Sequence, residues 1–366
     1  MTGTRADFGK LEPLAKAAIC EGYQVSFFVT GMHMMKKYGN TNMEVRAVDG
    51  AEIFEYVNQK EGDSLDNILA KTIIGFSDFV NEHCTDLVVV HGDRIESIAV
   101  SLVCAINYIY SAHIEGGEIS GTIDESLRHC NSKLCLTHFV SSQSAADRVS
   151  RLGESKDRVF VIGSPELDSH SKPSGVDIIE VKDRYGIPFD DYGIVIFHPV
   201  TSERETMGLQ AKSLYECLNT SKRNFVVIAP NNDPGSQELF ETLSQLSKER
   251  FRIIPSMRFN YFSELMKNAS VIIGNSSVGV REAPFIGVSS IDIGSRQNNR
   301  AFNDSIINAS PYESEKILDL LASDFWGKRY QAATSFGNGE SCAKFIEVLA
   351  TDEFWAHSNQ KSFSDN

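Results

Sequence analysis

The stretch Leu87-Val-Val-Val-His-Gly-Asp-Arg94 is a short, continuous apolar run that ends in a polar turn. Such a run is typical of a parallel strand covered on both faces, because a strand with one wet face would alternate apolar and polar residues. Similar runs, each followed by a helix-like segment, occur at Val25–Thr30, Ile109–Ile114, His138–Ser141, Val159–Gly163, Ile194–His198, Phe225–Ala229, Arg252–Pro255, Val271–Gly274 and Ser290–Ile293. Two successive βαβ arrays predict an α/β protein with two doubly wound, Rossmann-like domains.

The length of 366 residues also favours two domains, since one hydrophobic core rarely supports so long a chain. The polar stretch Asp168–Gly175 contains Pro, Gly and Ser and is predicted to be irregular. We therefore expect an N-terminal domain over residues 1–167 and a second domain over residues 176–339. Residues 340–366 are expected to be helical through Ala350 and Phe354, followed by a polar tail that frays from Ser358.

The overall charge and composition exclude several classes of protein. A formal net charge of −14 would repel nucleic acid and anionic membranes, and there is no basic run to act as a local footprint. The longest apolar stretch, Ile98–Tyr110, is too short to span a bilayer, and the N-terminus has no secretory signal. The seven cysteines include no C-x-x-C pair, which indicates reduced thiols in a cytoplasmic protein.

The start of the chain is unusual for this type of fold. Thr2-Gly-Thr-Arg5 resembles the turn after a first strand, yet almost no strand precedes it. The first strand of a doubly wound sheet is usually central. We therefore expect either a start upstream of Met1 or a trimmed chain.

Carboxylates gather at the ends of the predicted strands, where open α/β sheets bind their ligands. Asp93 follows one strand, and Glu115 falls where the next strand meets two glycines. Burying a carboxylate there is costly unless it has a partner or a task. Asp124 lies nine residues further on, but Thr122–Glu125 also fits a capping box and Asp124 could simply pair with Arg128 along a helix.

Two other turns are suited to phosphate. Gly3-Thr4-Arg5 enters a helix, so that backbone N–H groups and the Arg5 guanidinium could meet an anion. Asn275-Ser-Ser-Val-Gly279 offers hydroxyl and backbone donors, with Glu282 placed to reach ribose hydroxyls. The simpler alternatives are a tight turn with a surface Arg5, and serines that only cap a helix with Glu282 complementing its dipole.

Several familiar motifs are absent. There is no G-x-G-x-x-G fingerprint for a nicotinamide dinucleotide, no H-E-x-x-H and no G-x-S-x-G. His113-Ile-Glu115 resembles half of a zinc deaminase motif, but the P-C-x-x-C half is missing. We therefore expect no metal and no cofactor.

Seven segments of the chain resemble, in order, the hydrolysing UDP-N-acetylglucosamine 2-epimerases, which release N-acetylmannosamine and UDP at the start of sialic acid biosynthesis. The segments are Met1–Phe8, Thr30–Met35, His91–Arg94, His113–Ser126, Phe197–Thr201, Asn275–Pro284 and Asp292–Arg300. The resemblance implies a GT-B fold with the UDP-sugar in an interdomain cleft, a C-terminal helix that packs back on the N-terminal domain, and a homodimer or homotetramer. It places catalytic carboxylates at Asp93, Glu115 and Asp124, and UDP-binding positions at Arg5, His198, Ser276, Ser277, Gly279, Glu282 and Arg296.

The chemistry of such a reaction explains the need for several carboxylates. Loss of UDP from C1 acidifies the C2 hydrogen, so that elimination to a 2-acetamidoglucal requires a base, and hydration requires an acid on the opposite sugar face. The alternatives left open are a hydrolysing 2-epimerase of a UDP-2,4-diacetamido-2,4,6-trideoxyhexose, a non-hydrolysing 2-epimerase and a GT-B glycosyltransferase. A non-catalytic sugar-nucleotide-binding regulator would have little use for the carboxylates.

Overall fold

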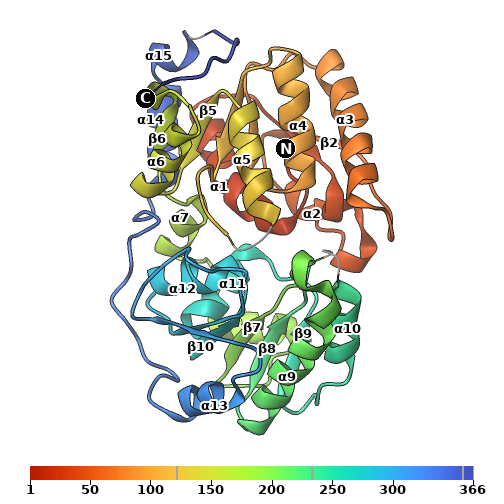
Figure 1. Cartoon of the computed structure of the whole chain (residues 1–366), viewed down its shortest axis with the longest axis vertical. Helices are drawn as coiled ribbons and strands as arrows, with labels where there is room; N and C mark the ends of the chain where they lie inside the picture. Colours follow the sequence, from red (N-terminus) through yellow and green to blue (C-terminus); the bar gives the residue numbers. More distant parts are fainter. Residues whose placement is uncertain (121–122, 232–234, 357, 366) are drawn as a thin grey trace. The chain divides into compact units, whose positions relative to one another are not determined.

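The computed structural model describes residues 1–120, 123–231, 235–356 and 358–365 (Figure 1). The chain divides into two compact units. The first contains residues 1–118, 124–171 and 336–366, and the second contains residues 119–123 and 172–335.

The strands of the first unit are short and parallel. They are β1 (Val25–Val29), β2 (Ala51–Glu55), β3 (Val88–His91), β4 (Ser111–Ile114), β5 (Thr137–Val140) and β6 (Val159–Val161). β1 pairs with β2, and the other four form a sheet in the order β3-β4-β5-β6. Its helices are α1 (Arg5–Cys20), α2 (Asn42–Val45), α3 (Leu65–Glu82), α4 (Ile95–Ile106), α5 (Ile123–Leu134), α6 (Gln143–Arg151), α7 (Pro165–Ser171), α14 (Ser341–Leu349) and α15 (Asp352–Trp355).

The first two residues join the two sheets of this unit. The Thr2 amide donates to Phe28 O and the Thr30 amide donates to Thr2 O, each at 3.0 Å, while the Met1 amino group donates to Val89 O at 3.0 Å. Met1 and Thr2 therefore lie between β1 and β3. Counting this segment as strand one, the order of the unit is that of a doubly wound Rossmann sheet, with its switch point between Thr2 and β3.

The second unit has one parallel sheet of six strands in the order β12-β11-β10-β7-β8-β9. The strands are β7 (Gly193–Ile196), β8 (Phe225–Ile228), β9 (Phe251–Ile254), β10 (Val271–Gly274), β11 (Ser290–Ile293) and β12 (Ile306–Ala309). Because β7 is the first strand of the unit, this is again the doubly wound order, with the switch point between β7 and β10. The helices are α8 (Ile178–Tyr185), α9 (Met207–Thr220), α10 (Ser236–Ser244), α11 (Phe259–Lys267), α12 (Glu282–Phe285) and α13 (Ser314–Ala322).

Apolar clusters cover both faces of each sheet. In the second unit, one cluster joins the sheet to α9, α10 and α13, and another joins it to α8, α11 and α12. The strands between them, such as Val271–Gly274, are buried throughout. Burial on both faces explains why these strands are continuous apolar runs, and each buried Val or Ile contributes roughly 1.5–3 kcal/mol.

Two predictions of irregular structure, for residues 168–175 and for the tail from Ser358, are partly wrong. Residues 168–171 complete α7, which starts at Pro165, a residue preorganised for the first helical turn. Asp168 is buried and accepts hydrogen bonds from the Ser341 and Cys342 amides at 2.9 and 2.7 Å, so that α7 caps the start of α14. Beyond α15, residues 358–365 make specific hydrogen bonds to the first unit instead of fraying.

Helix α14 packs on the first unit through aromatic side chains. Phe345 meets Phe139 of β5 edge-on at 4.8 Å between ring centroids, and Phe354 lies 5.2 Å from the ring of Tyr110. All four side chains are buried. Such pairs contribute beyond their area burial, which fixes α14 and α15 to the sheet that carries Glu115.

Candidate active site

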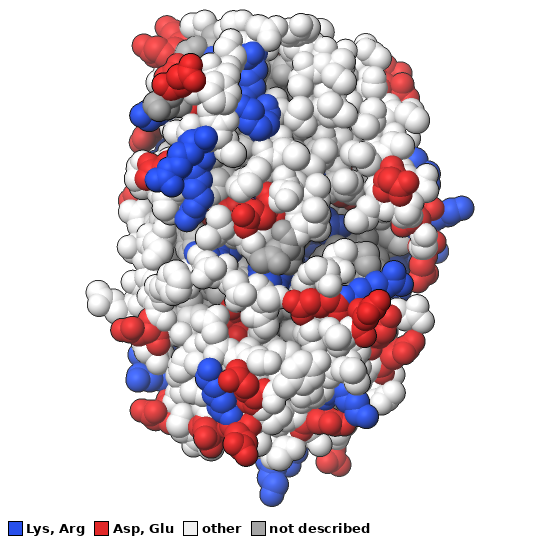
Figure 2. Space-filling view, in the orientation of Figure 1, with Lys and Arg blue, Asp and Glu red and all other residues white. Residues whose placement is uncertain are grey.

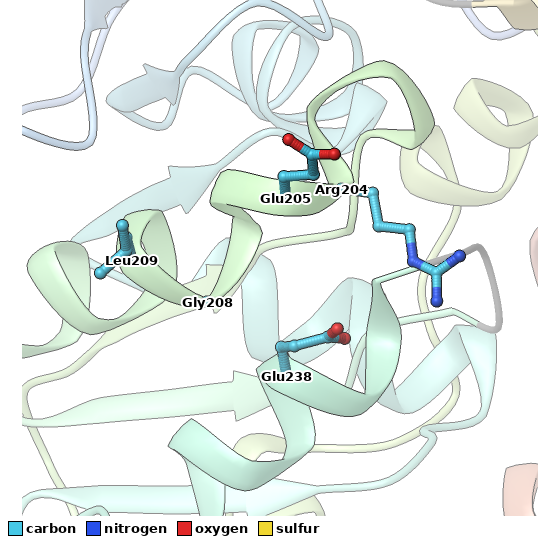
Figure 3. Close-up of a pocket in the computed structure, with 5 residues that line it drawn as sticks. All are labelled: Arg204, Glu205, Gly208, Leu209 and Glu238. Carbon is cyan, nitrogen blue, oxygen red and sulfur yellow. The ribbon is translucent and has the colours of Figure 1, made fainter.

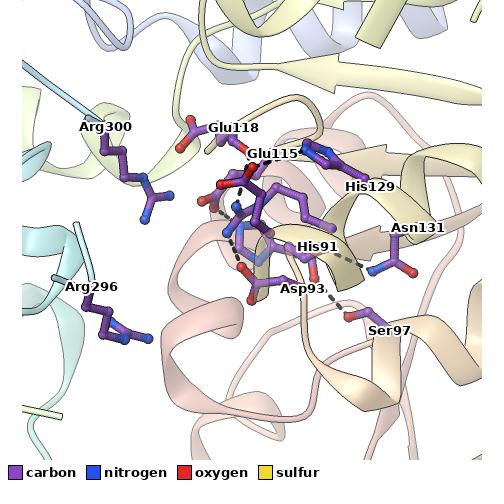
Figure 4. Close-up of polar contacts among 12 residues, drawn as sticks. His91, Asp93, Ser97, Glu115, Glu118, His129, Asn131, Arg296 and Arg300 are labelled. Atoms are coloured by element: carbon purple, nitrogen blue, oxygen red, sulfur yellow. Dashed lines mark hydrogen bonds and ion pairs between the residues drawn. The ribbon is translucent and has the colours of Figure 1, made fainter. Parts of the chain in front are cut away.

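The loop after β4 places Glu115 in a strained backbone conformation. Its φ angle is +72°, a left-handed value that costs a residue with a side chain roughly 1–2 kcal/mol. The carboxylate is buried and lies 2.7 Å from His91 Nε2 (Figure 4). Lys10 Nζ lies 2.8 Å from the same carboxylate. The Lys10 charge offsets the cost of burying a carboxylate, and strain of this kind is concentrated at functional sites.

The glycines after Glu115 are required by close packing. Gly117 has a φ of +75°, and a Cβ added there would lie 2.2 Å from Ala145 O. Glu118 follows, with a buried carboxylate that accepts a hydrogen bond from the Ser141 hydroxyl. The loop is therefore held on both sides of its glycines.

Asp93 follows β3 and is held by Arg128, a buried residue of α5. Arg128 Nη2 pairs with Asp93 Oδ2, and Nη1 donates to Glu118 O at 3.2 Å. Arg94, the neighbour of Asp93 in the chain, could also pair with a carboxylate. Its Nε lies 3.7 Å from Glu96 Oε2.

Helix α5 also fixes the turn that carries Asp93. Asn131 Nδ2 donates to Gly92 O at 3.0 Å, and His113 Nε2 lies 2.8 Å from the same oxygen. Ser132 Oγ lies 3.1 Å from His113 Nδ1. Burial holds the pKa of His113 well below its ordinary value, which leaves a neutral imidazole that supports the turn.

Asp124 lies in the first turn of α5 and is partly buried. One helical turn separates it from Arg128, so that the two side chains emerge on the same side of α5. The expected cap of this helix, Thr122, falls outside the described residues. Sequence reasoning overlooked Lys10 and His91 as partners of Glu115, and Lys10 gives no local signal because it is 105 residues away.

The turn before α1 differs from the predicted phosphate site. Thr4 and Asp7 form a capping box, and the Gly3 and Thr4 amides donate to the Asp7 carboxylate at 3.0–3.2 Å. A carboxylate therefore already occupies the donors that were expected to meet a phosphate. Arg5, the first residue of α1, pairs with Glu44 of α2.

In the second unit, Asn275 connects the ends of three strands. Its side chain accepts from the His198 amide at 2.7 Å and donates to His198 O at 2.8 Å. Its carbonyl accepts from Gln297 Nε2 at 2.9 Å and from Arg296 Nη1 at 3.2 Å. Asn275 thus joins the residues after β7, β10 and β11 at the switch point, although the sequence analysis gave it no role of its own.

His198 is oriented by a backbone donor. The Asn231 amide donates to its Nδ1 at 3.2 Å. A neutral imidazole with an occupied Nδ1 carries its proton on Nε2. The second nitrogen is therefore presented as a donor.

The helix start predicted after Asn275 consists of two short helical segments. Ser276 caps a single 3₁₀ turn, Ser277–Gly279, and Glu282 begins the four-residue α12. A dipole this short is weak, so that hydroxyl and amide donors dominate any anion binding. Gly279 packs so closely that an added Cβ would lie 2.7 Å from Ser290 Oγ, and Glu282 is buried.

A separate hollow lies on the second unit, formed by the 3₁₀ segment Thr201–Thr206 with α9 and α10 (Figure 3). It is lined by Arg204, Glu205, Gly208, Leu209 and Glu238. None of the predicted site residues lines it. Elsewhere, a search of the described residues finds no three His, Cys, Asp or Glu side chains grouped to hold a metal ion.

Two doubly wound parallel sheets, each with polar residues at its switch point, define an α/β protein with two Rossmann-like units. The family model described as UDP-N-acetylglucosamine 2-epimerase matches residues 18–350. The chain is an enzyme that belongs to this family. It is 40% identical over 371 residues to the UDP-N-acetylglucosamine 2-epimerase of Neisseria meningitidis serogroup B, an alignment that covers 100% of this chain and 98% of the relative.

Two further comparisons are informative. The UDP-N,N'-diacetylbacillosamine 2-epimerase (hydrolyzing) of Legionella pneumophila is 30% identical over 360 residues, covering 96% of this chain and 94% of that protein. The structure of Methanocaldococcus jannaschii UDP-GlcNAc 2-epimerase in complex with UDP-GlcNAc and UDP has a TM-score of 0.79 at 19% identity, covering 95% of this chain and 97% of that one. The likeness confirms the predicted GT-B fold of two Rossmann-like domains. In the described part of the chain, no helix combines the length and apolarity needed to cross a membrane.

Proposed function

We propose that the protein is a hydrolysing 2-epimerase that converts UDP-N-acetylglucosamine and water to N-acetylmannosamine and UDP, the first step of sialic acid biosynthesis. The observation that carries this proposal is Glu115, a buried carboxylate held in a left-handed conformation between Lys10 and His91. A second carboxylate, Asp93, lies at the neighbouring strand end. Such residues suit proton transfer, which requires fixed groups near the reacting carbon.

The reaction proceeds in two steps. A carboxylate removes the C2 proton, the C2–H electrons form the C1–C2 double bond, and the C1–O bond breaks to release UDP. In the second step an acid group delivers a proton to C2 of the glucal from the opposite face, water adds through its oxygen to C1, and the proton that this water loses passes to a carboxylate. We assign proton handling near C2 to Glu115 and Asp124, and the positioning of water or the sugar to Asp93.

We assign UDP to the switch point of the second unit, with a further contact from Arg5. The proposed contacts are the Nε2 donor of His198, the donors of Ser276, Ser277 and Gly279, the carboxylate of Glu282 for ribose, and Arg296. No cofactor takes part in the proposed reaction.

Product analysis tests the proposal. Nuclear magnetic resonance of the reaction with UDP-N-acetylglucosamine should show free N-acetylmannosamine and UDP. Formation of UDP-N-acetylmannosamine would identify a non-hydrolysing 2-epimerase. Turnover that requires an acceptor would identify a glycosyltransferase.

One alternative substrate is favoured by a specific comparison. The Legionella relative is named for a UDP-N,N'-diacetylbacillosamine, a 2,4-diacetamido-2,4,6-trideoxy sugar. Offering both UDP-sugars in competition and identifying the released hexosamine separates the two substrates. Preference for the trideoxy sugar would identify it as the substrate, and the proposed hydrolytic mechanism would still apply.

We further propose that the protein forms a homodimer or homotetramer through α4. Its residues that are not buried are all apolar, namely Ile95, Ile98, Leu102, Ala105 and Ile106, whereas Glu96 is buried. Figure 2 shows the surface over α3 and α4 largely free of charge. An uncharged apolar face lets two copies of a chain with net charge −14 meet without strong repulsion. Light scattering should show an oligomer for the native chain and a monomer for Ile98→Asp.

The cytoplasm is the proposed location. The seven cysteines are all free thiols, and Cys104, Cys135 and Cys217 are buried. A reducing compartment keeps such thiols unpaired. Fractionation of cells expressing the native gene tests this location, and recovery in a secreted fraction would contradict it.

A further inference from the structure

The C-terminal tail, residues 358–365, is tied to the end of α5 by a lysine. Lys361 Nζ donates to Ser132 O at 2.7 Å and to Cys135 O at 2.5 Å, and pairs with Glu154 Oε2 at 2.5 Å. Both carbonyls lie at the C-terminal end of α5, where helical carbonyls lack intrahelical partners. A cation there also meets the negative end of the helix dipole.

Other contacts hold the tail in the same place. The Ser364 amide donates to Gly153 O at 3.0 Å, and the Phe363 ring packs on Gly153, where an added Cβ would lie 2.2 Å from a ring carbon. Lys133 Nζ lies 5.3 Å from the centre of that ring. Asn359 Nδ2 donates to Tyr108 O at 2.8 Å. The tail is therefore anchored on both sides of Lys361.

The buried face of α5 supports the candidate active site. Arg128 holds Asp93, and Asn131 holds the Gly92 carbonyl. Ser132, whose carbonyl Lys361 binds, also uses its hydroxyl to contact His113, and His113 contacts Gly92 O. One residue thus connects the tail to the turn that carries Asp93.

We propose that Lys361 is a positioning residue, which caps α5 and thereby holds Asp93 and the Glu115 loop in register for the reaction. The assignment rests on the proposed function of those carboxylates. The Lys361 side chain bonds to Glu154, Ser132 O and Cys135 O, and we infer that it affects turnover through these contacts with α5 and not by touching the reacting groups.

The test compares Lys361→Met with Lys133→Met. Both lysines pair with Glu154, but Lys133 is half-exposed, and its other contacts are with Leu152 O and the Phe363 ring, not with α5 carbonyls. Methionine at position 133 can keep a sulfur–aromatic contact with that ring. We expect Lys361→Met to lower kcat about tenfold with KM and UDP affinity unchanged, Lys361→Arg to restore most of the loss, and Lys133→Met to stay within twofold of the native enzyme. A native kcat in Lys361→Met, or an equal loss in Lys133→Met, would overturn the proposal.

A second measurement separates this inference from the proposed function. Amide hydrogen exchange in residues 91–94 and 114–118 should be faster in Lys361→Met than in Lys133→Met, whatever substrate the enzyme uses. If no UDP-sugar is turned over by the native enzyme, the proposed function fails and the exchange result still decides the role of Lys361. If Lys361→Met does not fold, Phe363→Ala, which loosens the tail without removing the lysine, should show the same exchange pattern, and native exchange in it overturns the proposal.

Discussion

At the ends of β3 and β4, beside the switch point of the first unit, Glu115 and Asp93 are held by Lys10, His91 and Arg128. At the switch point of the second unit, His198 and the residues after β10 are held by the amide side chain and the carbonyl of Asn275. The two units have the same strand order. Ion pairs hold the polar residues in the first unit, whereas amide and backbone hydrogen bonds hold them in the second. Charged pairs suit proton transfer, whereas neutral donors and fixed backbone suit binding, which supports the proposal that the two units divide these tasks.

The largest effect should come from removing the charge at the centre of the first unit. Glu115→Gln should lower kcat by roughly two to four orders of magnitude, the usual worth of a general acid or base, while UDP affinity stays near the native value. Steady-state kinetics and UDP titration measure the two quantities. Glu12→Gln is the control, because Glu12 pairs with Lys16 one turn further along α1. Near-native turnover in Glu115→Gln would remove the residue from the mechanism.

The buried carboxyl group of Asp292, in the second unit, gives a further test of the comparison between the two units. Asp292 of β11 is buried beside Asn308, and burial raises its pKa to about 7. Because the unfolded carboxyl has an ordinary pKa near 3.8, the unfolded chain releases this proton first, and stability is lost as pH rises from about 4 through 7. The loss approaches about 4 kcal/mol above pH 8, taking 1.36 kcal/mol per pKa unit.

Denaturant unfolding at pH 5 and pH 8.5 measures this effect. Asp292→Asn should show a weaker decline in stability between the two pH values than the native chain. Asp319→Asn, at an exposed residue of α13, should decline as the native chain does. Equal declines in the native chain and Asp292→Asn would show that Asp292 is ionised in the folded protein.

The backbone of the Glu115 loop can be tested without touching a charge. Gly117→Ala should destabilise the protein by about 3 kcal/mol, because it combines a left-handed φ of +75° with a Cβ 2.2 Å from Ala145 O. Gly62 has a φ of +86° with nothing within 4 Å of an added Cβ, so that Gly62→Ala should cost about 1 kcal/mol. Thermal unfolding measures the loss of stability in both variants. Equal losses would mean that the Glu115 loop shifts to accommodate the added methyl group.

The smallest effect is expected from removing the hydrogen bonds between Asn275 and His198 in the second unit. Asn275→Ala removes two hydrogen bonds to His198 and should cost about 2 kcal/mol of stability, at about 1 kcal/mol per bond. It should also weaken UDP binding about tenfold and leave kcat within a few-fold of the native value. Asn268→Ala, at a residue that bonds only within α11 and its end, is the control. A larger loss in kcat than in UDP affinity would break the proposed division of tasks.

The strands that are buried on both faces were predicted from the sequence, whereas two partly exposed edge strands were not. The central strands, such as Val271–Gly274, are apolar throughout because both faces are covered. The strands β2 (Ala51–Glu55) and β12 (Ile306–Ala309) were missed because they lie at sheet edges and carry Glu or Asn on partly exposed faces. An edge strand lacks the uniform apolar signal on which the prediction relied.

Residues of the candidate site could be predicted from the sequence where they directly follow a predicted strand. Polar residues after β3, β4, β7 and β10 were identified because parallel strands present their carboxyl ends together. The contacts of Lys10 with Glu115 and of Arg128 with Asp93 were not, since they join residues 105 and 35 positions apart. The role of Asp7 was missed because a capping box and an anion site use the same donors.

The left-handed conformation of Glu115 has a consequence for protein engineering. Glycine adopts that conformation without the steric cost, so that Glu115→Gly would relieve about 1 kcal/mol of backbone strain, and Lys10 would retain Glu166 at 3.7 Å. A library sorted only for heat resistance would therefore tolerate or enrich the loss of this acid. Stabilising the enzyme by directed evolution requires an activity screen in every round.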